Sequence, residues 1–259
     1  MQRRHFQQLL EVHQAQNRFL CVGLDSDVSK IPSGQTQLSF NKAIIAATKD
    51  IVAAYKPNVA FYEAEGVAGW ETLKKTIQFI LEEAPQTLVI LDAKRADIGN
   101  TNLGYAKAAF EELEADAITL NPYIGGEALQ PFLDYQNKGC FILCRTSNEG
   151  AKEFQDLEVG GEPLYLKVAK QVSQKWNKNK NCGLVVGATF PEELKKVREA
   201  APDLPFLVPG VGTQGGDAKT VLKNAGKNCL INVSRSVLFA SNGPHFAEDA
   251  RNELLKLLR

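Results

Sequence analysis

The chain has 259 residues, of which 44% are hydrophobic, enough to bury a sizeable core. Its 30 basic and 30 acidic residues give a formal net charge of zero, which argues against broad electrostatic binding to nucleic acid or to an anionic membrane. The longest apolar runs are too short to span a bilayer, and the N-terminal residues lead into a polar, glutamine-rich stretch instead of an apolar signal core. We therefore expect a cytoplasmic protein.

Short apolar runs alternate with amphipathic stretches along the whole chain. The strand-like runs are Phe19–Leu24, Ala54–Pro57 continuing toward Phe61, Thr87–Leu91, Ala117–Leu120, Cys140–Cys144, Gly183–Val186, Phe206–Val208 and Cys229–Val233. Helical spacing is found in Arg3–Ala15, Asn41–Val52, Gly69–Glu83, Leu103–Glu112, Gly126–Gln136, Glu162–Trp176, Pro191–Glu199, Asp217–Asn224 and Asn242–Leu258. Eight strand–helix repeats behind one leading helix predict an α/β fold, the (β/α)8 TIM barrel.

No shift in composition marks a domain boundary, so we expect residues 1–259 to form a single domain. An open, doubly wound sheet is the alternative architecture, but the first strand-like run is not followed by the Gly-x-Gly-x-x-Gly turn of nucleotide-binding sheets. The longest irregular segment, residues 146–161, follows the fifth run. It predicts either a lid over a site or an ordinary surface excursion.

The cysteines and histidines give little support to metal or triad chemistry. The five cysteines form no Cys-x-x-Cys pair and lie in or beside apolar runs: Cys21, Cys140, Cys144, Cys182 and Cys229. We expect them to be buried free thiols. The three histidines have no metal-binding spacing and lie away from the charged segments: His5, His13 and His245.

The densest charged segment is Asp92-Ala-Lys94-Arg-Ala-Asp97, which directly follows the apolar run Thr87–Leu91. We expect the strand to open into a loop here, at the end where barrel enzymes keep their active sites. A lysine held between carboxylates favours its protonated form, which suits an acid that delivers a proton to carbon. The same pattern also fits an ion-pair network that only fixes a loop.

The last two strand-like runs end in an anion-binding pattern. The glycine-rich segment Pro209–Gly216 follows the seventh run, and Arg235 follows the eighth. Glycines let backbone N–H groups approach an anion closely, and an arginine side chain can grip phosphate oxygens with two N–H groups. A glycine-rich loop alone is more often a plain turn, but together with Arg235 it predicts a phosphate site.

These segments together resemble the orotidine 5′-phosphate decarboxylase family. The run Asp92-Ala-Lys94-Arg-Ala-Asp97-Ile98-Gly-Asn-Thr101 is similar to that family's Asp-x-Lys-x-x-Asp-Ile signature, and Pro209-Gly-Val-Gly-Thr-Gln214-Gly215-Gly is similar to its phosphate-gripping loop. Further matches follow in place and in order at Val22–Asp25, Lys56–Asn58, Asn121–Gly126 and Val233–Ser236. The resemblance covers essentially the whole chain and is strongest to the longer bacterial branch.

The resemblance implies decarboxylation of orotidine 5′-phosphate to uridine 5′-phosphate in pyrimidine biosynthesis, without a metal or an organic cofactor. It implies that Lys94 stabilises and protonates C6 of the pyrimidine, that Asp92 lies beside the departing carboxylate, and that Lys56 and Asp97 complete a Lys-Asp-Lys-Asp array. The substrate contacts it implies are Asp25, Ile98, Thr101, Ser147, Pro209, Gln214, Gly215 and Arg235. Among these, Ser147 would read the pyrimidine edge, although the run Thr146-Ser147-Asn148 leaves that register open by one residue.

The resemblance also implies a homodimer with shared active sites, in which Asp97 and Thr101 reach the ribose bound by the partner subunit. Two other functions stay open. A related Mg²⁺-dependent sugar-phosphate decarboxylase would need carboxylates arranged as an octahedral oxygen site, whereas Lys56 puts a cation where a ligand is wanted. A nucleotide-binding module without catalysis would have no need of the charged set Asp92, Lys94 and Asp97.

Overall fold

The structure is a computed structural model that describes residues 4–212 and 215–258. Within these residues, eight parallel strands pair in chain order and close into a barrel, because β8 also pairs with β1. The strands are β1 (Leu20–Leu24), β2 (Ala54–Pro57), β3 (Leu88–Arg95), β4 (Ala117–Leu120), β5 (Gly139–Arg145), β6 (Cys182–Val186), β7 (Phe206–Pro209) and β8 (Cys229–Val233). The predicted (β/α)8 barrel is confirmed, and the open sheet is wrong.

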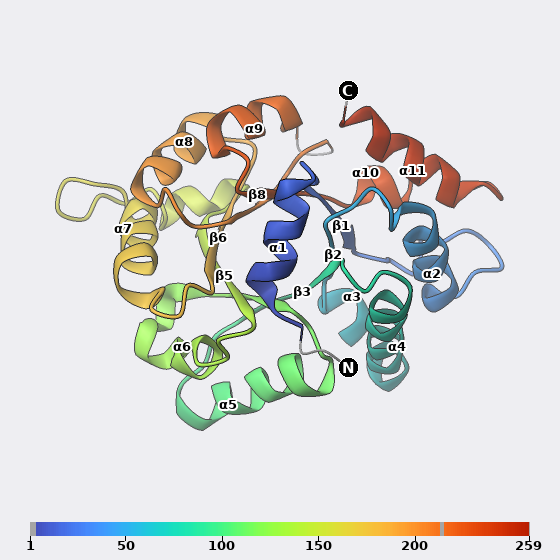
Figure 1. The fold of residues 1–259 in the computed structure, drawn as a ribbon, viewed down its shortest axis with the longest axis horizontal. Helices are drawn as coiled ribbons and strands as arrows, with labels where there is room; N and C mark the ends of the chain where they lie inside the picture. Colours follow the sequence, from blue (N-terminus) through green and yellow to red (C-terminus); the bar gives the residue numbers. More distant parts are fainter. Residues whose placement is uncertain (1–3, 213–214, 259) are drawn as a thin grey trace.

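Helices surround the barrel and cover the outer face of the strands (Figure 1). They are α2 (Gln37–Thr48), α3 (Ala60–Glu63), α4 (Gly66–Glu83), α5 (Gly99–Lys107), α6 (Gly126–Leu133), α7 (Leu164–Gln171), α8 (Pro191–Ala200), α9 (Ala218–Ala225), α10 (Arg235–Leu238) and α11 (Phe246–Lys256). The π-helical turns η1 (Ala108–Glu112) and η4 (Val172–Trp176) continue α5 and α7, and short 3-10 helices follow β4 and β5 as η2 (Pro122–Ile124) and η3 (Glu149–Glu153).

The structure corrects the predicted boundary of β3. The strand continues past Leu91 to Arg95, so Asp92 and Lys94 belong to the strand and not to a loop after it. Pairing with β4 resumes at Arg95 after a β-bulge. The polar residues between Leu91 and Arg95 therefore lie within the strand. The sequence alone predicts a loop for such a charged stretch, because the pairing with the neighbouring strand cannot be seen in it.

Two other boundaries also differ from the prediction. The chain after β2 turns into α3, so the expected continuation of the strand toward Phe61 is wrong. Helix α2 begins at Gln37 instead of Asn41 because Thr36 and Ser39 cap its first turn reciprocally, each side chain accepting from the other's backbone N–H.

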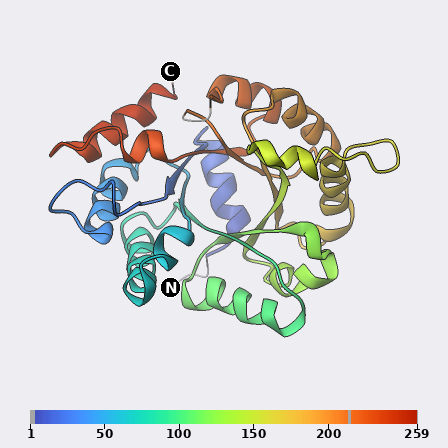
Figure 2. The ribbon, with the colours of Figure 1, turned by 180° about the vertical axis from the view of Figure 1, so that it is seen from behind.

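The leading helix, α1 (Phe6–Ala15), lies across the barrel and closes the N-terminal ends of the strands (Figure 1). Seen from the opposite side, it lies behind the strands (Figure 2). Phe6 and Leu10 pack among interior side chains of the barrel, and the Phe6 ring meets Phe141 edge-to-face with centroids 5.7 Å apart. Arg4 donates two hydrogen bonds to the buried carboxylate of Asp116, at 2.8 and 2.6 Å. With this end sealed, only the C-terminal ends of the strands can admit a ligand.

The five cysteines are buried and free, as predicted. Burial raises the pKa of the Cys21 thiol to about 12, so it stays protonated at neutral pH. The helices described here include none that is long and apolar enough to cross a membrane.

Phe6→Ala should lower the free energy of unfolding by about 3–5 kcal/mol, because it empties a fully buried ring site between α1 and the barrel. Urea unfolding measures the loss, with Phe154→Ala as the control, since the Phe154 side chain is 62% exposed. Phe6 lies at the end of the barrel opposite the charged strand ends, so the turnover of Phe6→Ala per folded molecule should equal that of the wild type. Equal stability of the two variants would contradict the packing of Phe6 between α1 and the barrel interior.

Candidate active site

A cavity of about 420 Å³ opens among the C-terminal ends of the strands. Such a volume falls within the roughly 300–1,000 Å³ typical of small-molecule sites. Each of the eight strands, or the loop directly after it, contributes to the lining. Residues predicted from the sequence line it at seven positions: Asp25, Lys56, Asp92, Lys94, Ser147, Pro209 and Arg235.

Four charged side chains, from β2, β3 and the position directly after β1, form a ladder that lines the cavity. Lys56 Nζ donates to Asp92 Oδ2 at 2.8 Å and lies 3.8 Å from Asp25 Oδ1. Lys94 Nζ donates to the other oxygen of the same carboxylate, Asp92 Oδ1, at 2.6 Å. The charges therefore alternate in sign in the order Asp25, Lys56, Asp92 and Lys94.

The ladder is stable as a set of ions because its members compensate one another. Burial by itself would raise the pKa of Asp92, but the ammonium groups of Lys56 and Lys94 outweigh it and hold that pKa well below the usual carboxyl range. Burial would lower the pKa of Lys56, but the carboxylates of Asp92 and Asp25 raise it above its ordinary value. Lys56 and Asp92 are only 4% and 7% exposed, so neither charge is compensated by bulk water.

The backbone around Lys94 is held by a residue that the sequence analysis missed. Lys94 has φ 47°, in the left-handed region, which costs a non-glycine residue about 1–3 kcal/mol. The N–H groups of Ala93 and Lys94 donate to Thr119 Oγ1 at 3.0 and 2.9 Å. Thr119 Oγ1 in turn donates to Asp92 Oδ1 at 2.9 Å. A threonine inside a strand is ordinary in sequence, so nothing in the pattern marks it.

The end of β5 is fixed by two further anchors that the sequence analysis missed. Buried Arg145 forms an ion pair with Asp156, with Nε 2.8 Å from Oδ1, and its guanidinium stacks on Phe190 with Cζ 4.5 Å from the ring centroid. The Thr146 N–H donates to Gln155 Oε1 at 2.8 Å. These contacts tie the start of the long 146–161 segment against the cavity.

The remainder of the 146–161 segment does not cover the site. After η3, a bridge between Glu158 and Pro163 closes a loop that projects outward beside α7 (Figure 1). From this segment, Thr146–Asn148 and Gln155 line the cavity. In this structure the segment is therefore both a cavity wall and a surface excursion, and it does not close over the site.

The ends of β7 and β8, where the sequence predicts an anion site, also line the cavity. Pro209–Val211, Asn232, Ser234 and Arg235 line the cavity there. The loop after β7 folds back so that Val211 bridges to Gly216, and Gly212 adopts φ 82°, which only glycine takes readily. Gly215 lies in this loop without lining the cavity, and Gln214 lies outside the described residues.

Besides Gly215, three more predicted site residues do not line the cavity of their own chain. Asp97, Ile98 and Thr101 lie where β3 leads into α5. The Ile98 N–H donates to Asp97 Oδ1 at 2.7 Å, and the Ile98 side chain is 66% exposed. The resemblance assigns Asp97 to the array through the partner subunit, and within its own chain Asp97 lies outside the cavity.

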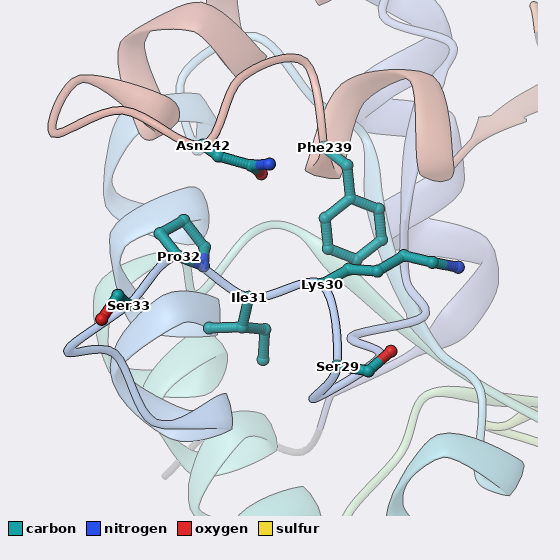
Figure 3. A pocket seen from close by; sticks show the side chains of 7 residues that line it. All are labelled: Ser29, Lys30, Ile31, Pro32, Ser33, Phe239 and Asn242. Atoms are coloured by element: carbon teal, nitrogen blue, oxygen red, sulfur yellow. The ribbon is translucent and has the colours of Figure 1, made fainter.

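A second hollow of about 350 Å³ lies between the loop after β1 and the turn after α10 (Figure 3). Figure 3 shows the Lys30 side chain running past the Phe239 ring. Among the described residues of this lining, Lys30 is the one that carries a charge, and its Nζ already pairs with Asp27 at 3.0 Å. The hollow holds no member of the charged ladder.

Asp92→Asn should lower the free energy of unfolding by about 3 kcal/mol at pH 7, because it removes the carboxylate that compensates buried Lys56. The pKa of Asp92 is lowered in the folded chain. Its stabilising effect is thus complete above the unfolded value of about 3.9 and is lost as the pH falls below it.

Urea unfolding of both proteins should therefore give a difference that is constant from about pH 7 to 5 and shrinks toward about pH 3. Asp134→Asn, at an exposed position after α6, is the control and should change stability by less than about 0.5 kcal/mol. A difference that stays the same at every pH would contradict the ion pairs as its source.

Comparison with known proteins agrees with this geometry. Residues 18–250 match the family described as Orotidine 5′-phosphate decarboxylase / HUMPS family. The chain is 56% identical over 238 residues to the orotidine 5′-phosphate decarboxylase of Herpetosiphon aurantiacus, covering 90% of this chain and 88% of that one. It is 47% identical over 259 residues to the one from Flavobacterium johnsoniae, covering 97% and 94%.

Solved structures give the same result. The Leishmania donovani OMP decarboxylase matches with a TM-score of 0.86 and 41% identity, covering 98% of this chain and 97% of that one. The orotidine 5′-monophosphate decarboxylase of Methanocaldococcus jannaschii matches with a TM-score of 0.68 and 26% identity, covering 92% and 98%. The chain belongs to the orotidine 5′-phosphate decarboxylase family.

Proposed function

We propose that this protein removes CO2 from orotidine 5′-phosphate and releases uridine 5′-phosphate, as a carboxy-lyase of pyrimidine biosynthesis. One observation supports this more than any other. Asp92 is held between two ammonium groups in a cavity that is also lined by Arg235 and by the ends of β7 and β8. A nucleoside monophosphate whose pyrimidine carries a carboxylate would place that carboxylate near the charged ladder and its phosphate near Arg235.

The charged ladder suits a reaction that leaves an electron pair on carbon. When the C6–carboxylate bond breaks, the pair stays on C6, where no π system of the ring can delocalise it. Stabilisation must then come from fixed charges, which act strongly in a site that excludes water. The Lys94 ammonium would stabilise the pair and deliver its proton to form the C6–H bond, after which water restores the proton to Lys94. Asp92 would lie beside the departing carboxylate.

The remaining cavity residues would bind the nucleotide. Asp25 and Lys56 would hold the ribose 3′-OH, and Ser147 would read the pyrimidine edge from the anchored segment after β5. Arg235 would bind the phosphate together with Pro209, Gln214 and Gly215 of the loop after β7. Binding energy from the phosphate then positions the reacting carbon against Lys94.

A homodimer would explain why Asp97, Ile98 and Thr101 lie outside their own cavity. The elements that follow β2, β3 and β4 expose large apolar side chains: Val67, Trp70, Ile98, Leu103, Tyr123 and Ile124. If these side chains form one contiguous patch, such a patch is typical of a surface that another protein covers. We propose that a two-fold axis passes here and that each chain supplies Asp97, Ile98 and Thr101 to its partner's site.

We propose that the reaction uses neither a metal nor an organic cofactor. In a magnesium-dependent sugar-phosphate decarboxylase, the carboxylates would converge on a cation. Here the Lys56 ammonium already occupies the place between Asp25 and Asp92, so the protein provides that positive charge itself. Five free thiols also fit the reducing cytoplasm, where we place the protein.

The test is turnover of orotidine 5′-phosphate by protein treated exhaustively with EDTA. The absorbance of the pyrimidine should fall and uridine 5′-phosphate should form, with no gain on adding Mg²⁺. Lys94→Ala is the matched variant: it should still bind uridine 5′-phosphate but lose at least about 100-fold in kcat, since a preorganised charge and the proton donor disappear together. Turnover that needs added Mg²⁺ would favour the sugar-phosphate alternative, and no turnover at all would sink the proposal.

Subunit mixing tests the shared site. Lys94→Ala and Asp97→Ala homodimers should each be nearly inactive. A heterodimer of the two has one site with both defects and one with neither, so exchange of subunits should restore about half of the wild-type activity per heterodimer. If mass spectrometry confirms heterodimers and no activity returns, Asp97 acts within its own chain.

A further inference from the structure

We propose that Thr119 is a positioning residue for catalysis, whose hydroxyl sets the geometry of the Asp92–Lys94 pair. The inference rests on the proposed function, in which that pair faces the reacting carbon. Thr119 lies near the end of β4, is only 1% exposed as a residue, and lines the cavity beside the charged ladder.

The need for such a residue arises from the bulge in β3. Leu91 pairs with Ile118 and Arg95 pairs with Leu120, so the β3 stretch between Leu91 and Arg95 faces the single β4 residue Thr119. At a bulge the extra residues lose their regular ladder partners. Two of the N–H groups in this stretch, those of Ala93 and Lys94, bind the hydroxyl of Thr119 at 3.0 and 2.9 Å.

Every hydrogen-bonding position of the Thr119 hydroxyl is occupied. A threonine hydroxyl has one donor and two acceptor positions. Both acceptor positions take the N–H groups of Ala93 and Lys94, and the donor points at Asp92 Oδ1, 2.9 Å away. Asp92 Oδ1 also accepts from Lys94 Nζ at 2.6 Å. The hydroxyl therefore fixes Lys94 at both ends, at its own backbone N–H and through the carboxylate that binds its ammonium.

Lys94 depends on this hold because its backbone is strained. A lysine with φ 47° returns to an ordinary conformation unless its surroundings prevent it. Its side chain is about half exposed to the cavity, so packing restrains it little. Catalytic groups must keep their place to within about 0.5 Å, and a small misplacement reduces the rate even when the ligand still binds.

The experiment compares three purified variants. Thr119→Val keeps the shape and removes the hydroxyl, and Thr119→Ser keeps the hydroxyl and removes a methyl group. Thr76→Val is the control for loss of a buried hydroxyl elsewhere: Thr76 is fully buried in α4 and its Oγ1 accepts from Asn41 Nδ2 at 3.1 Å. Measured for each are kcat and KM for orotidine 5′-phosphate, the Kd for uridine 5′-phosphate, and Tm.

We expect Thr119→Val to lose about 10- to 100-fold in kcat, as is typical of one hydrogen bond to a charged group, while KM and Kd change by less than about threefold. Thr119→Ser should keep kcat within about threefold of the wild type. Thr76→Val should lower Tm without changing kcat per folded molecule.

Two results would overturn the inference: Thr119→Val with wild-type kcat, or Thr119→Ser as impaired as Thr119→Val. A Thr119→Val protein with lower Tm and unchanged kcat, like Thr76→Val, would show that the Thr119 hydroxyl stabilises the fold without positioning Lys94. If Thr119→Val does not fold, the kcat of Thr119→Ser is the test: a value within about threefold of the wild type supports the inference, and a larger loss contradicts it. Failure of the proposed function is distinguishable, because the wild type itself would then not convert orotidine 5′-phosphate.

Discussion

The site depends on one constraint: the carboxylate of Asp92 must remain ionised although it is almost completely buried. A lone carboxylate there would take up a proton, because burial disfavours its charged form. Lys56 and Lys94 prevent this, one on each oxygen, and Asp25 keeps Lys56 charged in turn. The ladder leaves the Lys94 ammonium at the cavity, hydrogen-bonded to the Asp92 carboxylate. That arrangement has the features needed to stabilise a carbanion electrostatically.

The barrel makes this arrangement possible by combining rigidity at one end with access at the other. Helix α1 seals the N-terminal ends of the strands with Phe6 and Leu10, so the charged groups face only the C-terminal mouth. Lys56 and Asp92 project from the neighbouring strands β2 and β3, whose hydrogen bonding fixes their separation. The bulge opposite Thr119 then sets the path of β3 through Lys94 before the strand resumes its pairing at Arg95. The same fold thereby provides both the core and the strained backbone at Lys94.

The sequence predicted the fold well because parallel strands are buried on both faces and therefore read as continuous apolar runs. It also predicted seven residues that line the cavity. Asp92, Lys94, Pro209 and Arg235 belong to charged or glycine-rich segments at strand ends, whereas Asp25, Lys56 and Ser147 came from the family resemblance. It could not predict Thr119, Gln155 or Arg145 as anchors, because their roles depend on which strand or loop lies opposite. It ended β3 too early, since Asp92 and Lys94 look like loop residues until their pairing is known. The expected place of Asp97 in the array remains a prediction that needs a second chain.

The most direct measurement is the position of a bound nucleotide in a crystal structure of this protein with uridine 5′-phosphate. The account predicts C6 of the pyrimidine within about 3.5 Å of Lys94 Nζ, the distance of a reactive approach, with the phosphate at Arg235 and the loop after β7. A nucleotide bound with C6 facing away from Lys94, or with its phosphate elsewhere in the cavity, would contradict the central claim that the ladder of Asp25, Lys56, Asp92 and Lys94 is built around the reacting carbon.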